Sequence, residues 1–166
     1  MALRVCLAGA TGWAGSELAR GIAGCDDLAL VAAVARSSAG RALGDVLGEP
    51  RLAAPVFASA AKALATPCDV FVEYTKPDSA KVNVLAAIGH DAHVVIGTSG
   101  LTEQDYAEID TAARQQARGV LAVGNFALTV VLMQKVRRNG CQTDSAMGDR
   151  RLRARRQGRR TQRDGS

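Results

Sequence analysis

The stretch that decides the fold is RVCLAGATGWAG, at residues 4–15. Its first part, residues 4–8, is a short apolar run that predicts a buried strand. It continues into a Gly-x-x-Gly-x-x-Gly loop made by Gly9, Gly12 and Gly15, and residues 15–23 have the pattern of a helix. Glycines let the chain turn tightly and bring backbone N–H groups onto a phosphate at a helix N-terminus. This unit predicts a dinucleotide-binding loop, with a purely structural turn as the alternative.

Short apolar runs and helical patterns continue to alternate along the chain. We expect strands at 28–35, 69–73, 92–96 and 119–123, and helices at 59–65, 78–88, 102–118 and 128–135. Thr102 and Asp105 have the spacing of an N-cap and its partner. Strands that are apolar throughout, each followed by a helix, indicate a parallel sheet covered on both faces. Right-handed crossovers then predict a doubly wound, Rossmann-like α/β fold, which binds ligands beyond the carboxyl ends of its strands.

Composition separates the chain into two parts. Its 166 residues suit one domain, or one domain and a tail. Residues 1–136 carry a net charge of −2, whereas residues 137–166 hold ten arginines and three aspartates, a net charge of +7. We therefore expect a dinucleotide-binding domain at 1–136 and an Arg-rich tail at 137–166. No run is long enough to span a membrane and none resembles a signal peptide, so we expect a cytoplasmic chain. The four cysteines have no metal-ligand spacing, which predicts free thiols and no metal site.

The residues that follow the second predicted strand bear on the choice of dinucleotide. An acidic side chain there binds the ribose hydroxyls and favours NAD. The sequence instead reads Ala35-Arg36-Ser37-Ser38. A guanidinium beside hydroxyl groups suits a 2′-phosphate, so the prediction is NADPH or NADH with NADPH favoured, and a solvated Arg36 is the alternative. Trp13 either shields a cofactor or packs on the surface, and the sequence leaves both open.

Four motifs in order give a family resemblance. GATGWAG, EYTKP, GTSG and GNFA resemble the GxxGxxG, DFTxP, GTTG and ANFS segments of 4-hydroxy-tetrahydrodipicolinate (dihydrodipicolinate) reductases, from about residue 3 to residue 135. Glu73 and Tyr74 replace the family's Asp and Phe. The resemblance implies an NAD(P)H-dependent oxidoreductase of diaminopimelate and lysine biosynthesis. It also implies a small-molecule substrate and, in the parent family, a homotetramer.

The resemblance carries cofactor-binding roles to named positions. It assigns the pyrophosphate to Gly9, Ala10, Thr11, Gly12, Trp13 and Ala14, the 2′-phosphate to Arg36, the nicotinamide side to Gly97, Thr98 and Ser99, and the rest of the pocket to Val123, Gly124, Asn125 and Phe126. The family's proton-donating Lys and substrate-binding Gly-Thr pair lie later, in a K-x-D-x-P-S-G-T-A segment. We therefore predict no catalytic residue among these positions.

That later segment does not occur in the printed reading frame. Residues 138–166 can be back-translated with freely chosen synonymous codons. When that nucleotide sequence is read from the second base of the Arg138 codon, one consistent solution encodes GMAAKLIPQWEIVDYAREGKVDAPSGTA. We interpret the tail as a frameshifted substrate domain, so that this chain retains at most cofactor binding and does not form the parent tetramer. One alternative is a non-catalytic nucleotide-binding module whose basic tail binds nucleic acid incidentally and without specificity. Another is a reductase of the same fold that acts on a different carbonyl or imine.

Overall fold

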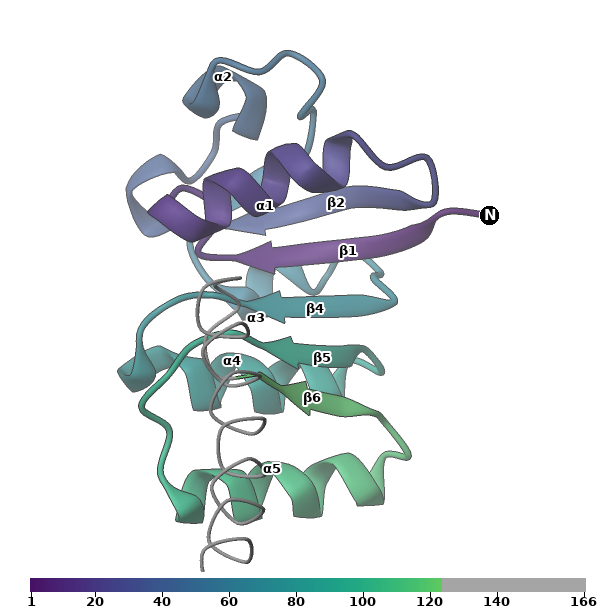
Figure 1. Ribbon diagram of the computed structural model, residues 1–166, viewed down its shortest axis with the longest axis vertical. Helices are drawn as coiled ribbons and strands as arrows, with labels where there is room; N and C mark the ends of the chain where they lie inside the picture. The colour runs from purple at the N-terminus through teal and green to yellow at the C-terminus, as the bar shows by residue number, and fades with distance from the viewer. Residues whose placement is uncertain (124–166) are drawn as a thin grey trace, which may run out of the picture. The chain divides into compact units, whose positions relative to one another are not determined.

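The computed structural model describes residues 1–123. The predicted helix at 128–135 and the predicted tail at 137–166 lie outside the described residues. Within the described part, six parallel strands form a sheet in the order β3-β2-β1-β4-β5-β6 (Figure 1). The strands are β1 (Leu3–Ala8), β2 (Leu28–Val34), β3 (Val56–Phe57), β4 (Val70–Glu73), β5 (His93–Ile96) and β6 (Val120–Ala122). The predicted doubly wound, Rossmann-like α/β fold is confirmed.

Helices connect the strands on both faces of the sheet. They are α1 (Trp13–Ala23), the 3-10 turn η1 (Arg36–Ser38), α2 (Leu43–Leu47), α3 (Ala60–Ala63), α4 (Pro77–Gly89) and α5 (Glu103–Gln115). Figure 1 shows α1 in front of β1 and β2, with α3 and α4 behind the sheet. In the described part, none of the helices is both long and apolar enough to cross a membrane.

Two short elements, β3 and α2, were not predicted from the sequence. β3 has two residues and α2 has five, so neither is long enough to show a hydrophobic period. Long-range hydrogen bonds hold β3 in place: the Val56 N–H donates to the Arg41 carbonyl at 2.9 Å, and the Ala33 N–H donates to the Pro55 carbonyl at 3.0 Å. These elements form through tertiary pairing, which a local pattern does not reveal.

The start of α5 was predicted correctly, but its end was not. The Thr102 hydroxyl accepts the Asp105 N–H at 3.2 Å, and the Asp105 carboxylate accepts the Thr102 N–H at 2.9 Å. This reciprocal pair is the capping box that the sequence indicates. The helix ends at Gln115 rather than at residue 118, because Ala117 adopts a φ of +50° and turns the chain toward β6.

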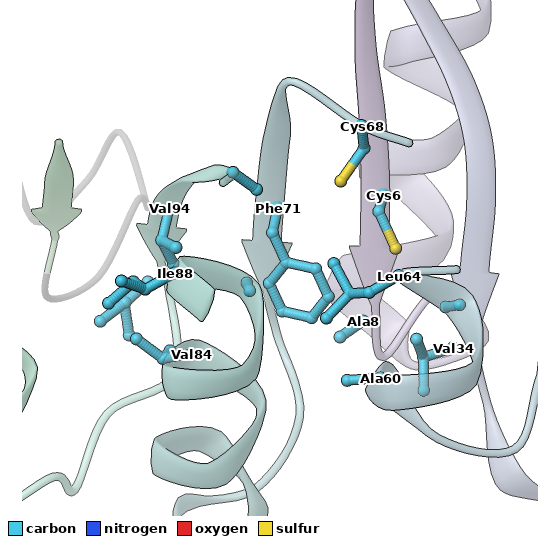
Figure 2. Close-up of a cluster of buried hydrophobic side chains, with 14 of the residues drawn as sticks. Cys6, Ala8, Val34, Ala60, Leu64, Cys68, Phe71, Val84, Ile88 and Val94 are labelled. Carbon is cyan, nitrogen blue, oxygen red and sulfur yellow. The ribbon is translucent and has the colours of Figure 1, made fainter. Parts of the chain in front are cut away.

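Small side chains make the core on each face of the sheet. Figure 2 shows the cluster on the α3 and α4 side, where Phe71 lies among Leu64, Val84, Ile88 and other fully buried apolar residues. On the other face, Leu7, Ile22 and Leu43 pack between the sheet and helices α1 and α2. Alanines fill much of the remaining space, which lets the helices approach the sheet closely. The sheet is therefore a rigid support for the loops at its carboxyl edge.

Strand order places a crevice at that edge. From β1 the chain runs to β2 and β3 on one side, then returns to β4, β5 and β6 on the other. The order therefore reverses between β1 and β4. Connections leave these two strands toward opposite faces, so their carboxyl ends flank an open crevice, which is where doubly wound sheets bind ligands.

Candidate functional site

A cavity of about 670 Å³ opens beyond the carboxyl ends of β1, β2 and β4. Residues from the four connections after β1, β2, β3 and β4 line it: Gly9, Thr11, Gly12, Val34, Ala35, Arg36, Ser37, Ala58, Ser59, Tyr74, Thr75, Lys76, Ser79 and Asn83. Two of these side chains, Arg36 and Lys76, are cationic, and none of the lining residues is acidic. The cavity is therefore suited to an anionic ligand.

Glycines at the end of β1 bring three backbone segments into close contact. Gly9 has a φ of +80°, and a Cβ at this position would lie 2.2 Å from the Tyr74 carbonyl oxygen. A Cβ on Gly15 would lie 2.0 Å from the Gly9 carbonyl oxygen. The Gly12 N–H donates to that same carbonyl at 2.9 Å. Side chains at positions 9 and 15 would separate the loop from β4 and α1, so these glycines bring the helix N-terminus to the crevice.

The N-terminus of α1 has no side-chain cap. Its N-cap is Gly12, which has no side chain to accept the first N–H groups, and its first turn contains no acidic residue. Free N–H groups and the positive end of the helix dipole favour an anion at this position. Trp13, the first residue of the helix, is 91% exposed. Both roles predicted for its ring, shielding a cofactor and packing on the surface, stay predictions.

Arg36 lies at the carboxyl end of β2, where it begins the 3-10 turn η1. Its side chain lines the cavity and forms no ion pair with an acidic residue within residues 1–123. Ala35, the residue before it, and Ser38, at the end of the turn, are buried. The guanidinium is thus available to a second anionic group at the β2 side of the cavity.

Glu73, the last residue of β4, is an acid buried behind the cavity wall. Its side chain has no exposed surface. One carboxylate oxygen, Oε1, accepts the Thr75 N–H at 2.7 Å and also accepts the Thr75 hydroxyl, while Oε2 accepts the Asn83 amide at 3.0 Å. Burial raises the pKa of Glu73, and the hydrogen bonds from Thr75, Asn83 and Thr98 oppose that rise. These donors offset part of the cost of burying the carboxylate, and the pKa of Glu73 stays raised.

The chain that forms this sheet, uncapped helix and basic cavity also matches a known protein family in its sequence. The family described as dihydrodipicolinate reductase, N-terminus, matches residues 3–126. The chain belongs to this family. A 4-hydroxy-tetrahydrodipicolinate reductase of Synechocystis sp. is 34% identical over 141 residues, covering 81% of this chain and 51% of that protein. The Bacillus cereus (strain B4264) reductase is 34% identical over 134 residues, covering 80% and 50%. The chain thus spans about half the length of the curated relatives that it matches.

Solved structures show the same relationship. The dipicolinate-bound dihydrodipicolinate reductase of Paenisporosarcina sp. TG-14 superposes with a TM-score of 0.66 at 27% identity, covering 81% of this chain and 52% of that one. A Synechocystis biliverdin reductase in complex with biliverdin and NADP+ superposes with a TM-score of 0.66 at 20% identity, covering 82% and 42%. The second likeness shows the fold alone.

The predicted cofactor residues of this dihydrodipicolinate reductase family member do not all line the cavity, and Ala10, Trp13 and Ala14 are among those that do not. Gly9, Thr11, Gly12 and Arg36 line the cavity together. Gly97, Thr98 and Ser99 follow β5 and are not among the residues that line it: a Cβ on Gly97 would lie 2.2 Å from the Tyr74 ring, Thr98 is buried, and Ser99 is exposed. Val123 follows β6, and its N–H donates to the Ile96 carbonyl at 3.0 Å. Gly124, Asn125 and Phe126 lie outside the described residues.

Sequence reasoning missed part of the cavity lining. Thr75, Lys76, Ser79 and Asn83 belong to the connection after β4 and the first turns of α4, and Ser59 is the N-cap of α3. The available signal was Pro77, which begins a helix after a strand and so marks a loop at the carboxyl edge. Ser79 and Asn83 are four residues apart on that helix, and this spacing places both on one face.

Proposed function

We propose that this chain carries the cofactor domain of an NAD(P)H-dependent reductase acting on a dihydrodipicolinate-type intermediate of diaminopimelate and lysine biosynthesis. Family membership supports the reaction class. The observation that carries the proposal is the uncapped N-terminus of α1, beside a cavity with two cations and no acid in its lining. A dinucleotide brings phosphates and little else that is charged, so this chemistry fits the cavity.

In this proposal the residues of the chain hold the cofactor and orient it. The Gly9 to Ala14 loop binds the pyrophosphate through backbone N–H groups and the α1 dipole. Arg36 binds the 2′-phosphate, which favours NADPH over NADH. Gly97, Thr98 and Ser99 support the nicotinamide end, and the segment from Val123 to Phe126 completes the pocket. The bound nicotinamide supplies the hydride, while the protein supplies position and electrostatics.

The choice of cofactor is tested with Arg36→Ala. Loss of a hydrogen bond to a charged group costs about 1.5–3 kcal/mol, so we expect NADPH affinity to fall roughly ten- to a hundred-fold. NADH affinity should change little, because NADH lacks the 2′-phosphate. Trp13, the single tryptophan, is exposed beside the cavity and reports binding by its fluorescence. Arg51→Ala is the matched control, since Arg51 is an exposed arginine outside the cavity lining. An unchanged ratio of the two affinities excludes Arg36 as the phosphate-binding residue.

For turnover, we propose that the chain as printed binds cofactor without reducing substrate. The supporting observation is that residues 138–166 as printed contain no KVDAPSGTA segment, which freely chosen synonymous codons yield when they are read in the shifted frame. Holding and orienting a reactant lowers the activation free energy by up to about 7–11 kcal/mol. Without the residues that do this, the rate of substrate reduction should fall by many orders of magnitude. The measurement is NADPH oxidation with fresh dihydrodipicolinate, comparing the printed chain with one whose frame is restored after Lys135. Equal activity in both preparations contradicts the proposal.

A further inference from the structure

The buried carboxylate of Glu73 connects two loops that the sequence separates. Thr75 and Asn83, whose side chains line the cavity, donate to it from the loop after β4 and from α4. Thr98, from the loop after β5, places its hydroxyl 3.5 Å from the same carboxylate. Glu73 itself is fully buried and is not among the cavity-lining residues. Glu73 therefore holds Thr75 and Asn83 in the cavity wall through hydrogen bonds, without lining the cavity itself.

The backbone of Glu73 holds the second loop as well. The Gly97 N–H donates to the Glu73 carbonyl at 2.9 Å. The Thr98 hydroxyl also lies 3.4 Å from the Glu73 carbonyl and 3.4 Å from the Thr75 carbonyl. Gly97 cannot move toward Tyr74, because the Tyr74 ring already occupies the space where a Cβ would be. The loop after β5 is thus fixed by one residue of β4 and its two successors.

A carboxylate is the group best suited to this position. Each side-chain partner of Glu73 is an N–H or O–H donor, and an ionised carboxylate accepts from all of them at once. An amide offers one acceptor oxygen and presents a donor at the other end. Burial of a charge is costly and is offset only when the surrounding donors are well placed. The donors must therefore keep their positions as long as Glu73 remains ionised.

Resting on the proposed cofactor site, we propose that Glu73 is a positioning residue that locks the loops after β4 and β5 into one support for the nicotinamide end of the cofactor. It does not touch the cofactor. The adenosine end lies at Arg36, on the opposite side of the cavity lining, and does not depend on this lock. Glu73 therefore contributes to binding of the whole dinucleotide and not to binding of its adenosine half.

The test compares NADPH with 2′,5′-ADP, which contains only the adenosine half. Glu73→Gln keeps the shape of the side chain and removes the charge. We expect a loss of about ten-fold in NADPH affinity, the effect of one or two misplaced hydrogen bonds, with 2′,5′-ADP affinity held within about two-fold. Thr98→Val removes only the hydroxyl and should give the same selective loss. Combined with Glu73→Gln it should add little, because both changes break one network.

Controls separate positioning from general stability. Val84→Ala leaves a cavity in the apolar core beside Asn83 and lowers stability without touching the network. It should leave both affinities unchanged while the protein is folded. Equal losses for NADPH and 2′,5′-ADP in Glu73→Gln, or no loss for either, overturn the positioning role. If Glu73→Gln does not fold, Glu73→Asp, which keeps the charge and withdraws the carboxylate from Asn83 and Thr98, decides by the same comparison. Failure of the unaltered chain to bind either ligand overturns the proposed function, and the role of Glu73 with it.

Discussion

The N-termini of α1 and α5 follow strands at the same edge of the sheet, yet side chains cap the backbone N–H groups of α5 and not those of α1. At α5, Thr102 and Asp105 cap the helix with their own side chains. At α1, the N-cap is a glycine and no side chain accepts its N–H groups. Both helices have the same need for partners. The side chains of the protein therefore complete the N-terminus of α5 and not that of α1.

Charge follows the same division. Asp105, in the first turn of α5, forms an ion pair with Lys81 at 3.1 Å, so the acid and the cation satisfy each other. Around the start of α1, Arg36 and Lys76 line the cavity without an acid among the lining residues. An incoming phosphate meets a carboxylate at α5 and positive charge at α1. The comparison thus favours α1 over α5 as the helix of the proposed phosphate site, independently of the sequence family.

Two glycines of α1 provide the strongest test of that contrast. A Cβ on Gly15 would overlap the Gly9 carbonyl, whereas a Cβ on Gly21 has no atom within 4 Å. We expect Gly15→Ala to push the helix away from the loop, costing about 1–3 kcal/mol of stability and most of the NADPH affinity. Gly21→Ala, in the same helix, should gain about 0.5–1 kcal/mol from helix propensity and bind NADPH normally.

Chemical denaturation and NADPH titration measure both effects. The pair is matched, since each variant adds one methyl group to the same helix. A Gly15→Ala protein that keeps its NADPH affinity would show that close approach of α1 to the loop is not required for binding.

A second test gives α1 the cap that α5 already has. Gly12 has an extended backbone (φ −74°, ψ 168°), which an Asp also adopts at an N-cap. In Gly12→Asp the carboxylate would accept the free N–H groups and repel phosphates. We expect NADPH affinity to fall at least about ten-fold, since like charges a few Å apart interact by more than 1 kcal/mol near a protein surface. Gly12→Asn, a neutral cap of the same shape, should lose less affinity.

Comparing the NADPH affinities of the two variants separates the effect of the added side chain from the effect of its charge. The loss in Gly12→Asn measures competition for the N–H groups together with the effect of a Cβ placed 3.2 Å from the Gly9 carbonyl oxygen. The additional loss in Gly12→Asp measures charge. If both variants bind NADPH as well as the unaltered chain, the N-terminus of α1 is not the phosphate site.

The sequence predicted the parts of this contrast that depend on local pattern. The glycine loop, the Thr102 cap and α4 were all visible, the last predicted at 78–88 and found at Pro77–Gly89. Whether a helix N-terminus is open can also be read from its first residues. The Glu73 network could not be read, because its partners Asn83 and Thr98 are ten and twenty-five residues away. Only strand register and the position of α4 bring those side chains together.

The smallest expected effect concerns acid stability at the capped helix. Hydrogen bonds from the Thr102 backbone and hydroxyl, together with Lys81, lower the pKa of Asp105 from 3.8 to about 2. A group whose pKa is lowered in the folded protein stabilises the fold above its unfolded pKa, and that stability is lost as the pH falls through the folded value. The contribution of Asp105 is therefore complete above about pH 4 and disappears toward pH 2.

Asp105→Asn removes the titration and tests this directly. The variant should be less stable than the unaltered chain at pH 6, and the difference in Tm should shrink as the pH falls from about 4 to about 2. The effect should be modest, because the carboxylate is close to solvent and its ion pair with Lys81 is screened. NADPH affinity at pH 7 should not change, since α5 begins away from the cavity lining. A difference in Tm that stays constant with pH would mean that Asp105 stabilises α5 through hydrogen-bond geometry alone. A loss of NADPH affinity in Asp105→Asn would contradict the contrast between the two helices, because the capped N-terminus of α5 would then also contribute to NADPH binding.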